Sequence, residues 1–316
     1  MAKNKKASLK AALSSTQARL KKKKQAEDAA AHKRAKGVTV KEQKSPRRST
    51  VPFKALDKIL LVGEGNFSFA VALLQHPPAQ LDHFPPANII ATAFDTEEEC
   101  YTKYPDAEQN IRVLREKGAQ VLFGVDATRL EKTSALKGRA FDRIVWNFPH
   151  AGKGITDKDR NILSNQVLIL GFLRSAERFL VRGPMPQLQP SRKRKRPSSD
   201  DEDECMYEDK NQAAGEDGRA RGTILITLRN VPPYTDWYAC RCCLRNVPKL
   251  AKSPPPPRSS SDLPNPHYVL FRSFIFNRSD WRGYEHRMTK GERAHGEGKS
   301  GEGGEDRTWE FFLKDE

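Results

Sequence analysis

Four groups of glycine, carboxylate and amide residues each follow a short apolar run in this chain. They are Gly63-Glu64-Gly65-Asn66, Asp95, Asp126 and Asn147-Phe148-Pro149-His150. Continuous apolar runs predict buried strands, and the carboxyl ends of parallel strands meet at one edge of a sheet, where ligands bind. We therefore expect the four groups to form one site. An aspartate after a strand is also a common helix cap, so each carboxylate has a purely structural alternative.

The first three groups suit an adenosine. Gly63 and Gly65 let the backbone turn sharply and approach a ligand without a Cβ atom. Asp95 follows the second predicted strand, where an acid can accept both ribose hydroxyls. Asp126 follows the third and can accept from an adenine amino group, with the Ala127 amide beside it as a donor.

The glycine loop distinguishes between adenosine cofactors. A nicotinamide enzyme needs a third glycine in G-x-G-x-x-G, and Ser68 occupies that place. Glu64 disfavours a phosphate, and the loop has no P-loop lysine, whereas a cationic sulfonium tolerates an acidic neighbour. The sequence therefore favours S-adenosylmethionine over NAD. Its predicted cofactor contacts run through the whole loop, Gly63, Glu64, Gly65, Asn66, Phe67 and Ser68.

The fourth group indicates the reaction. An Asn followed by Phe-Pro at a strand end resembles the N/D-P-P-Y element of methyltransferases that modify planar nitrogens. The Asn147 carboxamide can donate to and accept from a base edge, Phe148 offers a face for stacking, and Pro149 stiffens the loop. His150 is a candidate general base near the transferred methyl. A proline-containing loop that merely caps the sheet is the alternative.

The predicted elements alternate between strand and helix, which is typical of an α/β fold with a doubly wound, mostly parallel sheet, Rossmann-like and of the class I methyltransferase kind. Predicted strands cover residues 59–62, 88–94, 118–125, 141–146 and 223–228, and predicted helices cover 67–74, 96–117 and 157–180. Residues 269–276 and 308–313 are expected to add a terminal antiparallel pair at the sheet edge.

Charge separates a tail from a folded body. Residues 1–50 carry 16 Lys and Arg against three acids, so they hold +13 of the net charge of +16. We predict a disordered basic tail over 1–52 and a methyltransferase domain over 53–316. Such a tail binds phosphate backbones with strong salt dependence; a solubilising or targeting arm is the equal alternative.

A charged insert at about 183–222 contains a basic run, residues 192–196, followed by serines and an acidic run. We predict that it is disordered, and the basic run is a candidate nuclear localisation signal that phosphorylation of the serines would alter. A solvated low-complexity insert is the alternative. The spacing of Cys240, Cys242 and Cys243 is not that of a zinc site, and no apolar run is long enough to span a membrane, so we expect neither metal nor membrane.

The chain resembles the eukaryotic 25S ribosomal RNA (uridine-N3)-methyltransferases and their relatives. The resemblance rests on residues 61–69, 93–95, 124–128 and 141–150, with weaker matches at 160–161 and 283–291. It implies a nucleolar enzyme that uses S-adenosylmethionine to methylate N3 of a large-subunit rRNA uridine, with rRNA or pre-ribosomal particles as partners. His286, Arg287 and Thr289 either contact the RNA or line the pocket, or support the edge hairpin.

Methylation at uridine N3 needs little from a base, because the imide proton lies between two carbonyls and the sulfonium is a strong electrophile. N3 lies on the pairing edge, so the target must be single-stranded or flipped. We expect a monomer. The competing hypotheses are a non-catalytic assembly factor that keeps the fold and binds pre-ribosomal RNA, and a nicotinamide oxidoreductase, which the missing third glycine disfavours.

Overall fold

The computed structural model describes residues 50–81, 84–185, 220–229, 251–252, 254–255, 264–288 and 305–314. Its strands form one seven-stranded sheet in the order β3-β2-β1-β4-β5-β7-β6. The bounds are β1 Ile59–Val62, β2 Ile89–Thr92, β3 Gln120–Leu122, β4 Arg143–Asn147, β5 Thr223–Arg229, β6 Tyr268–Ile275 and β7 Asp306–Leu313. Strands β1 to β5 pair in parallel, and β7 pairs antiparallel to both β5 and β6. The predicted doubly wound, mostly parallel fold is confirmed.

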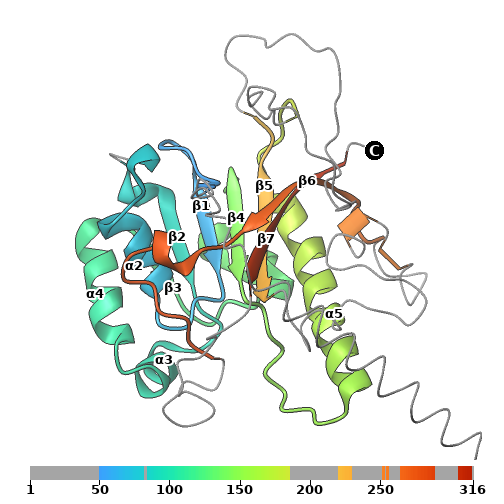
Figure 1. Ribbon diagram of the computed structural model, residues 1–316, viewed down its shortest axis with the longest axis horizontal. Helices are drawn as coiled ribbons and strands as arrows, with labels where there is room; N and C mark the ends of the chain where they lie inside the picture. The colour runs from blue at the N-terminus through green and yellow to red at the C-terminus, as the bar shows by residue number, and fades with distance from the viewer. Residues whose placement is uncertain are drawn as a thin grey trace, which may run out of the picture. The chain divides into compact units, whose positions relative to one another are not determined.

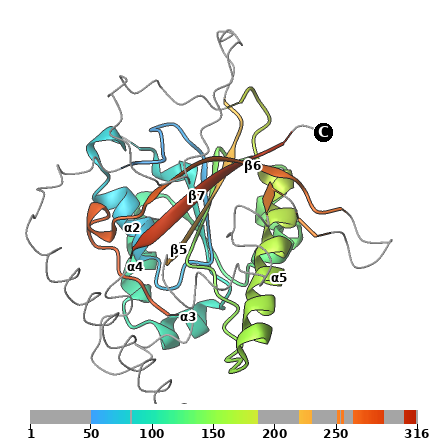
Figure 2. The ribbon, with the colours of Figure 1, turned by 45° about the vertical axis from the view of Figure 1, so that its right-hand side comes forward.

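Helices cover both faces of this sheet (Figure 1). The longer ones are α2 Ser68–Gln75, α3 Glu97–Lys103, α4 Ala107–Lys117 and α5 Lys158–Ala176. Short 3-10 turns connect them: η1 Ala79–Leu81, η2 Pro86–Asn88, η3 Ala127–Lys132, η4 Ser134–Leu136, η5 Glu177–Phe179 and η7 Arg278–Asp280. α2 and α4 lie on one face and α5 on the other, as Figure 2 shows from a second side.

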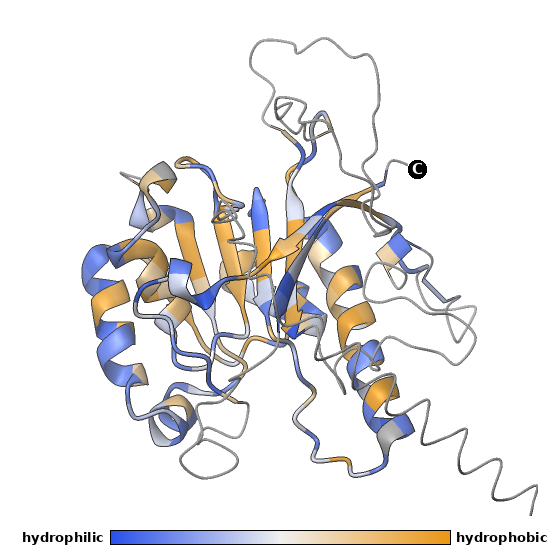
Figure 3. Ribbon diagram, in the orientation of Figure 1, coloured by the Kyte–Doolittle hydropathy of each residue, from blue (hydrophilic) through white to orange (hydrophobic). Residues whose placement is uncertain are grey.

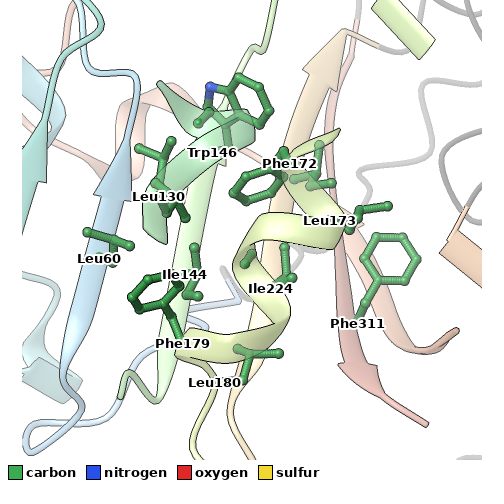
Figure 4. Packing of buried hydrophobic residues seen from close by; sticks show 14 of the residues in the cluster. Leu60, Leu130, Ile144, Trp146, Phe172, Leu173, Phe179, Leu180, Ile224 and Phe311 are labelled. Carbon is green, nitrogen blue, oxygen red and sulfur yellow. The ribbon is translucent and has the colours of Figure 1, made fainter. Parts of the chain in front are cut away.

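The α5 face buries the larger aliphatic cluster. Trp146 on β4 meets Phe172 on α5 edge to face, with ring centroids 4.6 Å apart. Figure 4 shows these rings beside Leu60, Ile144 and Ile224, which come from three adjacent strands. Side chains alternate between the two faces along a strand. Trp146 points to the α5 face, so the next residue of β4 points to the α2 face. This alternation places Asn147 on the α2 face.

The α2 face is more aromatic. Phe69 on α2 packs against Trp281 and Tyr284, and Phe276 stacks on Trp281. The chain after β6 therefore folds back over α2. Figure 3 shows by hydropathy that β1 and β2 are largely apolar, whereas the helices carry hydrophilic residues on their outer sides.

Two predicted elements differ from the structure. The stretch 96–117 is two helices, because Pro105 has no N–H to continue the first one and Tyr104 before it is extended. The first helix, α3, begins with a capping box between Thr96 and Glu99. The final antiparallel pair exists, but β7 inserts between β5 and β6, so only β6 forms the sheet edge.

Several predictions fall outside the described residues. These are the basic tail up to residue 49, the basic run and serines of the insert, and the cysteines at 240, 242 and 243. Among the described segments, no helix has both the length and the apolar character that a membrane span requires.

Candidate active site

β1 and β4 lie side by side in the sheet. The chain continues from β1 to β2 and β3 on one side and from β4 to β5 on the other, so the strand order reverses between β1 and β4. The crevice outside the carboxyl ends of two such strands is where open α/β sheets bind ligands. Gly63 follows β1 there and adopts φ +66°, and a Cβ on it would stand 2.7 Å from the Trp146 indole nitrogen of β4. The glycine loop and the end of β4 are therefore in direct contact.

Three residues of the glycine loop turn their side chains into the protein. Asn66 donates to Asp106 (2.6 Å) and accepts from the Ser68 amide and hydroxyl at 3.2 and 2.8 Å. The Phe67 ring is fully buried, although its backbone is left-handed with φ 61°. These side chains shape the turn, so a cofactor would meet the loop through its backbone.

Glu64 lies at the N-terminus of α2, where its carboxylate accepts from the Ala70 amide at 3.4 Å. Burial raises the pKa of this carboxyl from 4.5 to about 7, against the lowering effect of the Ala70 and Phe69 amides. The side chain therefore faces the helix, and its carboxyl keeps the proton to a higher pH than an exposed glutamate does.

We expect Glu64→Gln to stabilise the protein more at about pH 8 than at about pH 5. The folded pKa is raised, so this group stabilises the fold below its ordinary pKa, and that contribution is lost as pH rises through about 7. Thermal unfolding at the two pH values measures the difference. Glu99→Gln is the control, because its pKa is lowered by the Thr96 amide and hydroxyl and its removal should not stabilise at high pH. Equal shifts at both pH values for Glu64→Gln would contradict the prediction.

Asp95 and Asp126 lie at the ends of the next two strands. The Asp95 carbonyl accepts from Gly124 (3.0 Å), which ties the β2 and β3 ends together, and its carboxylate is paired with Lys103 of α3. Asp126 caps η3 through Oδ1, which accepts from the Thr128 amide at 2.8 Å and hydroxyl at 2.7 Å. Ala127 is buried at the start of η3. Asp126 therefore has the capping role that was the structural alternative. The cap uses Oδ1, so Oδ2 of Asp126 stays available to a ligand.

Asn147 ends β4 with its amide on the α2 face. Both its Nδ2 and Oδ1 are buried and have no hydrogen-bond partner among the described residues. Its neighbours in the same row of the sheet are Thr227 of β5 and Thr308 of β7, whose hydroxyls are 2.9 Å apart. The three line a small pocket whose walls include the rings of Phe69 and Phe276. A buried polar group without a partner is costly in a fold, so such a group commonly indicates a binding role.

The loop after β4 is held in an unusual conformation. Phe148 has φ 53°, and with Phe67 it is one of two non-glycine residues of positive φ among those described. Its amide donates to the Thr227 carbonyl at 2.7 Å. Positive φ in a bulky residue costs roughly 1–3 kcal/mol and persists at functional sites. Both strained residues follow the two strands at the switch point.

His150 and Pro149 continue this loop, and Pro149 is buried. Nδ1 of His150 accepts from the Gly152 amide at 2.8 Å, and burial lowers the pKa of the ring. The imidazole is therefore neutral with its basic nitrogen turned to the loop backbone, which does not favour proton uptake from a ligand. Asn165 of α5, which the sequence analysis missed, holds the loop by accepting from the Ala151 amide at 2.9 Å.

The segment from Tyr284 to Met288 crosses the glycine loop. The Glu285 amide and the Ser68 hydroxyl are 3.0 Å apart, and the His286 ring packs against Phe148 in a tilted arrangement with centroids 4.4 Å apart. Arg287 pairs with Asp106 and Glu285 at 3.3 and 2.8 Å. His286 therefore belongs to the site, Arg287 is engaged within the protein, and Thr289 lies outside the described residues.

Arg229, Arg278 and Asp306 also reach this site and were missed. Arg229 and Asp306 end and begin two paired strands, β5 and β7. A polar residue after an apolar strand was the signal that singled out Asp95, and Arg229 has the same position. In the parts of the chain described, no group of three or more His, Cys, Asp or Glu residues is arranged to hold a metal ion.

Comparison with known proteins agrees with this arrangement. The family described as rRNA (uridine-N3-)-methyltransferase BTM5-like matches residues 60–288. The chain is 38% identical over 131 residues to an uncharacterized protein of Arabidopsis thaliana, covering 40% of this chain and 60% of that protein. It is 28% identical over 242 residues to heavy metal-associated isoprenylated plant protein 41 of the same plant, covering 75% and 34%.

A third relative is the 25S rRNA (uridine(2634)-N(3))-methyltransferase of Saccharomyces cerevisiae, 28% identical over 271 residues, which cover 79% of this chain and 71% of the yeast protein. The chain thus spans only part of the two plant relatives' lengths. The family match includes the glycine loop, both aspartates, the loop after β4 and His286. This chain belongs to the BMT5-like family of rRNA (uridine-N3-)-methyltransferase-related proteins.

Proposed function

We propose that this protein is an S-adenosylmethionine-dependent RNA methyltransferase that modifies N3 of a uridine in large-subunit rRNA. The observation that carries the proposal is the buried amide of Asn147, which has no hydrogen-bond partner among the described residues and precedes Phe148 at the switch point of the sheet. An amide that donates and accepts side by side matches the uracil edge, where a carbonyl oxygen adjoins the N3 proton. The family membership supports the same reaction.

The residues present fit the cofactor. Asp95 would accept from the ribose hydroxyls, Asp126 would accept from an adenine amino group through Oδ2 because Oδ1 caps η3, and the glycine loop offers backbone without a phosphate-binding lysine. S-adenosylmethionine, when bound, supplies the methyl group as a sulfonium electrophile. Asn147 then orients the uracil edge, and Phe148 and Pro149 keep the loop rigid. The N3 proton, which lies between two carbonyls, would pass to water as the methyl group is transferred and S-adenosylhomocysteine is released, so the rest of catalysis is positioning.

Three further properties are part of the proposal. The target uridine is unpaired or flipped, since its pairing edge must reach Asn147. The protein acts as a monomer on rRNA or pre-ribosomal particles. It works in the nucleolus of the nucleus. The net charge of +16 and the basic run at 192–196 support this location, because basic proteins bind nucleic acid and a basic run can serve as a nuclear localisation signal.

The test is methyl transfer in vitro from labelled S-adenosylmethionine to large-subunit rRNA taken from cells that lack the protein. We expect 3-methyluridine in the digested RNA and thermal stabilisation by the demethylated product, S-adenosylhomocysteine, but not by NAD. Stabilisation by the product with no methyl transfer would favour the non-catalytic assembly factor. Stabilisation by NAD alone would overturn the cofactor assignment.

A further inference from the structure

Two arginines and a carboxylate lie next to the loop after β4. Arg278 of η7 places its guanidinium over the Phe148 ring, 5.2 Å from the centroid. Its Nε donates to Oδ2 of Asp306 at 2.7 Å, and the Nε of Arg229 lies 3.9 Å from the other Asp306 oxygen. We call Arg229 and Arg278 the arginine pair. One carboxylate thus holds two guanidinium groups beside the ring that follows Asn147.

The arginine pair is accessible and adjoins the Asn147 pocket. The side chains of Arg278 and Arg229 are 25% and 15% exposed, whereas Asp306 is 8% exposed beneath them. Arg229 lies two residues beyond Thr227 on the same strand face, towards the carboxyl edge of the sheet. Asn277 and Asp280, on either side of Arg278 in the chain, line the pocket of Asn147.

The charges of the arginine pair also reach His286, which packs against Phe148 at a tilt. Burial, and then the charges of Arg278 and Arg229, lower the pKa of the His286 ring to about 3. Burial and both charges disfavour the protonated form, so His286 is a neutral ring beside two cations. Cations next to aromatic rings are a combination that proteins use to bind single-stranded nucleic acid.

We infer that the arginine pair binds a backbone phosphate next to the target nucleotide, while Phe148 and His286 support the extruded base. This inference rests on the proposed function and names how the same site holds its RNA. Guanidinium groups bind phosphate through paired hydrogen bonds, and Asp306 fixes their direction in advance. Asp306 is therefore a positioning residue, and Arg278, which also lies over Phe148, links phosphate binding to the loop that carries Asn147.

The test measures binding of the full chain to a fluorescent single-stranded oligonucleotide containing the target uridine, across a range of salt concentrations. Arg278→Gln and Arg229→Gln should each weaken binding about tenfold and reduce the salt slope by about 0.7, the value for one lost phosphate contact on a single strand. Arg278→Lys should restore part of the affinity. Product binding and thermal unfolding confirm that each variant is folded.

Arg307→Gln is the matched control. Arg307 follows Asp306 directly, so it points to the opposite face of the sheet, and it pairs with Glu305 at 3.1 Å with its side chain 30% exposed. Its loss should leave RNA affinity and salt slope unchanged. The basic tail is present in all variants and contributes equally to each.

A second measurement removes the phosphate charge from the RNA and compares wild type with Arg278→Gln. The modified oligonucleotide has an uncharged methylphosphonate at the linkage beside the target uridine. Wild type should bind it about tenfold more weakly than the unmodified oligonucleotide, whereas Arg278→Gln should bind the two equally well. Equal losses in both proteins, or unchanged affinity in both arginine variants, overturn the inference. If wild type binds but transfers no methyl group while these differences hold, the phosphate site stands and the proposed reaction fails.

Discussion

Asn147→Ala should slow methyl transfer by about two to three orders of magnitude and make the protein more stable. The amide has two buried polar atoms without partners among the described residues. Leaving such a group unpaired costs about 1–3 kcal/mol, so its removal should raise the free energy of unfolding by roughly 1 kcal/mol after the small cavity is counted. The transfer rate should fall about 100- to 1,000-fold, as for the loss of one preorganised hydrogen-bonding group. Product affinity should not change, since the amide is assigned to the RNA base.

Asn165→Ala is the matched control for this pair of effects. Asn165 is also a buried asparagine, but its amide accepts from Ala151 at 2.9 Å and donates to the Asn161 carbonyl at 2.9 Å. Its loss should lower stability, the opposite sign to Asn147→Ala. Urea unfolding and single-turnover transfer measure both quantities for both variants. An Asn147→Ala protein that transfers methyl at the wild-type rate, or that loses stability together with activity, would make Asn147 a structural residue.

The sequence could predict the strands and their polar ends because the evidence for them is local. A run such as 59–62 is fully buried and is followed at once by the glycine turn, so neither its type nor its end depends on distant contacts. The end of β4 was predicted to within one residue for the same reason, whereas β2 ends at Thr92, two residues before the predicted end. Pro105 was visible too, and its effect on the stretch 96–117 was a matter of local chemistry that the helical periodicity obscured.

The parts that were missed depend on contacts between distant segments. Glu310 lies in an apolar strand and is fully buried, yet it is 2.6 Å from Arg272 and accepts from the Thr223 hydroxyl at 2.8 Å. No residue near Glu310 in the sequence indicates these partners, because the strand register brings them together from distant parts of the chain. Arg278 and Asp306 are likewise 28 residues apart and meet because the end of β6 pairs with the start of β7. Periodicity cannot show which polar residues of different strands share a row.

The second large effect concerns Asp95, whose carboxylate forms an ion pair with Lys103. Asp95→Ala should weaken binding of S-adenosylhomocysteine about 100-fold, because two ribose hydroxyls each lose a charged acceptor worth about 1.5 kcal/mol. Titration calorimetry measures the change. The fold should hardly alter, since the partly exposed pair with Lys103 contributes at most about 1 kcal/mol.

Lys103→Met separates ligand binding from the ion pair. In the structure the Lys103 ammonium donates to Asp95 Oδ1, an oxygen that the ribose would need. The ribose diol of the product must displace the Lys103 ammonium from Asp95. Product affinity should therefore rise several-fold in Lys103→Met. It should fall in Asp95→Ala, and equally in the double variant Asp95→Ala/Lys103→Met. Added salt screens the pair, and it should therefore tighten product binding to wild type but not to Lys103→Met. If Lys103→Met instead weakened binding as much as Asp95→Ala, the lysine would hold the ligand, and the competition between ammonium and ribose would be refuted.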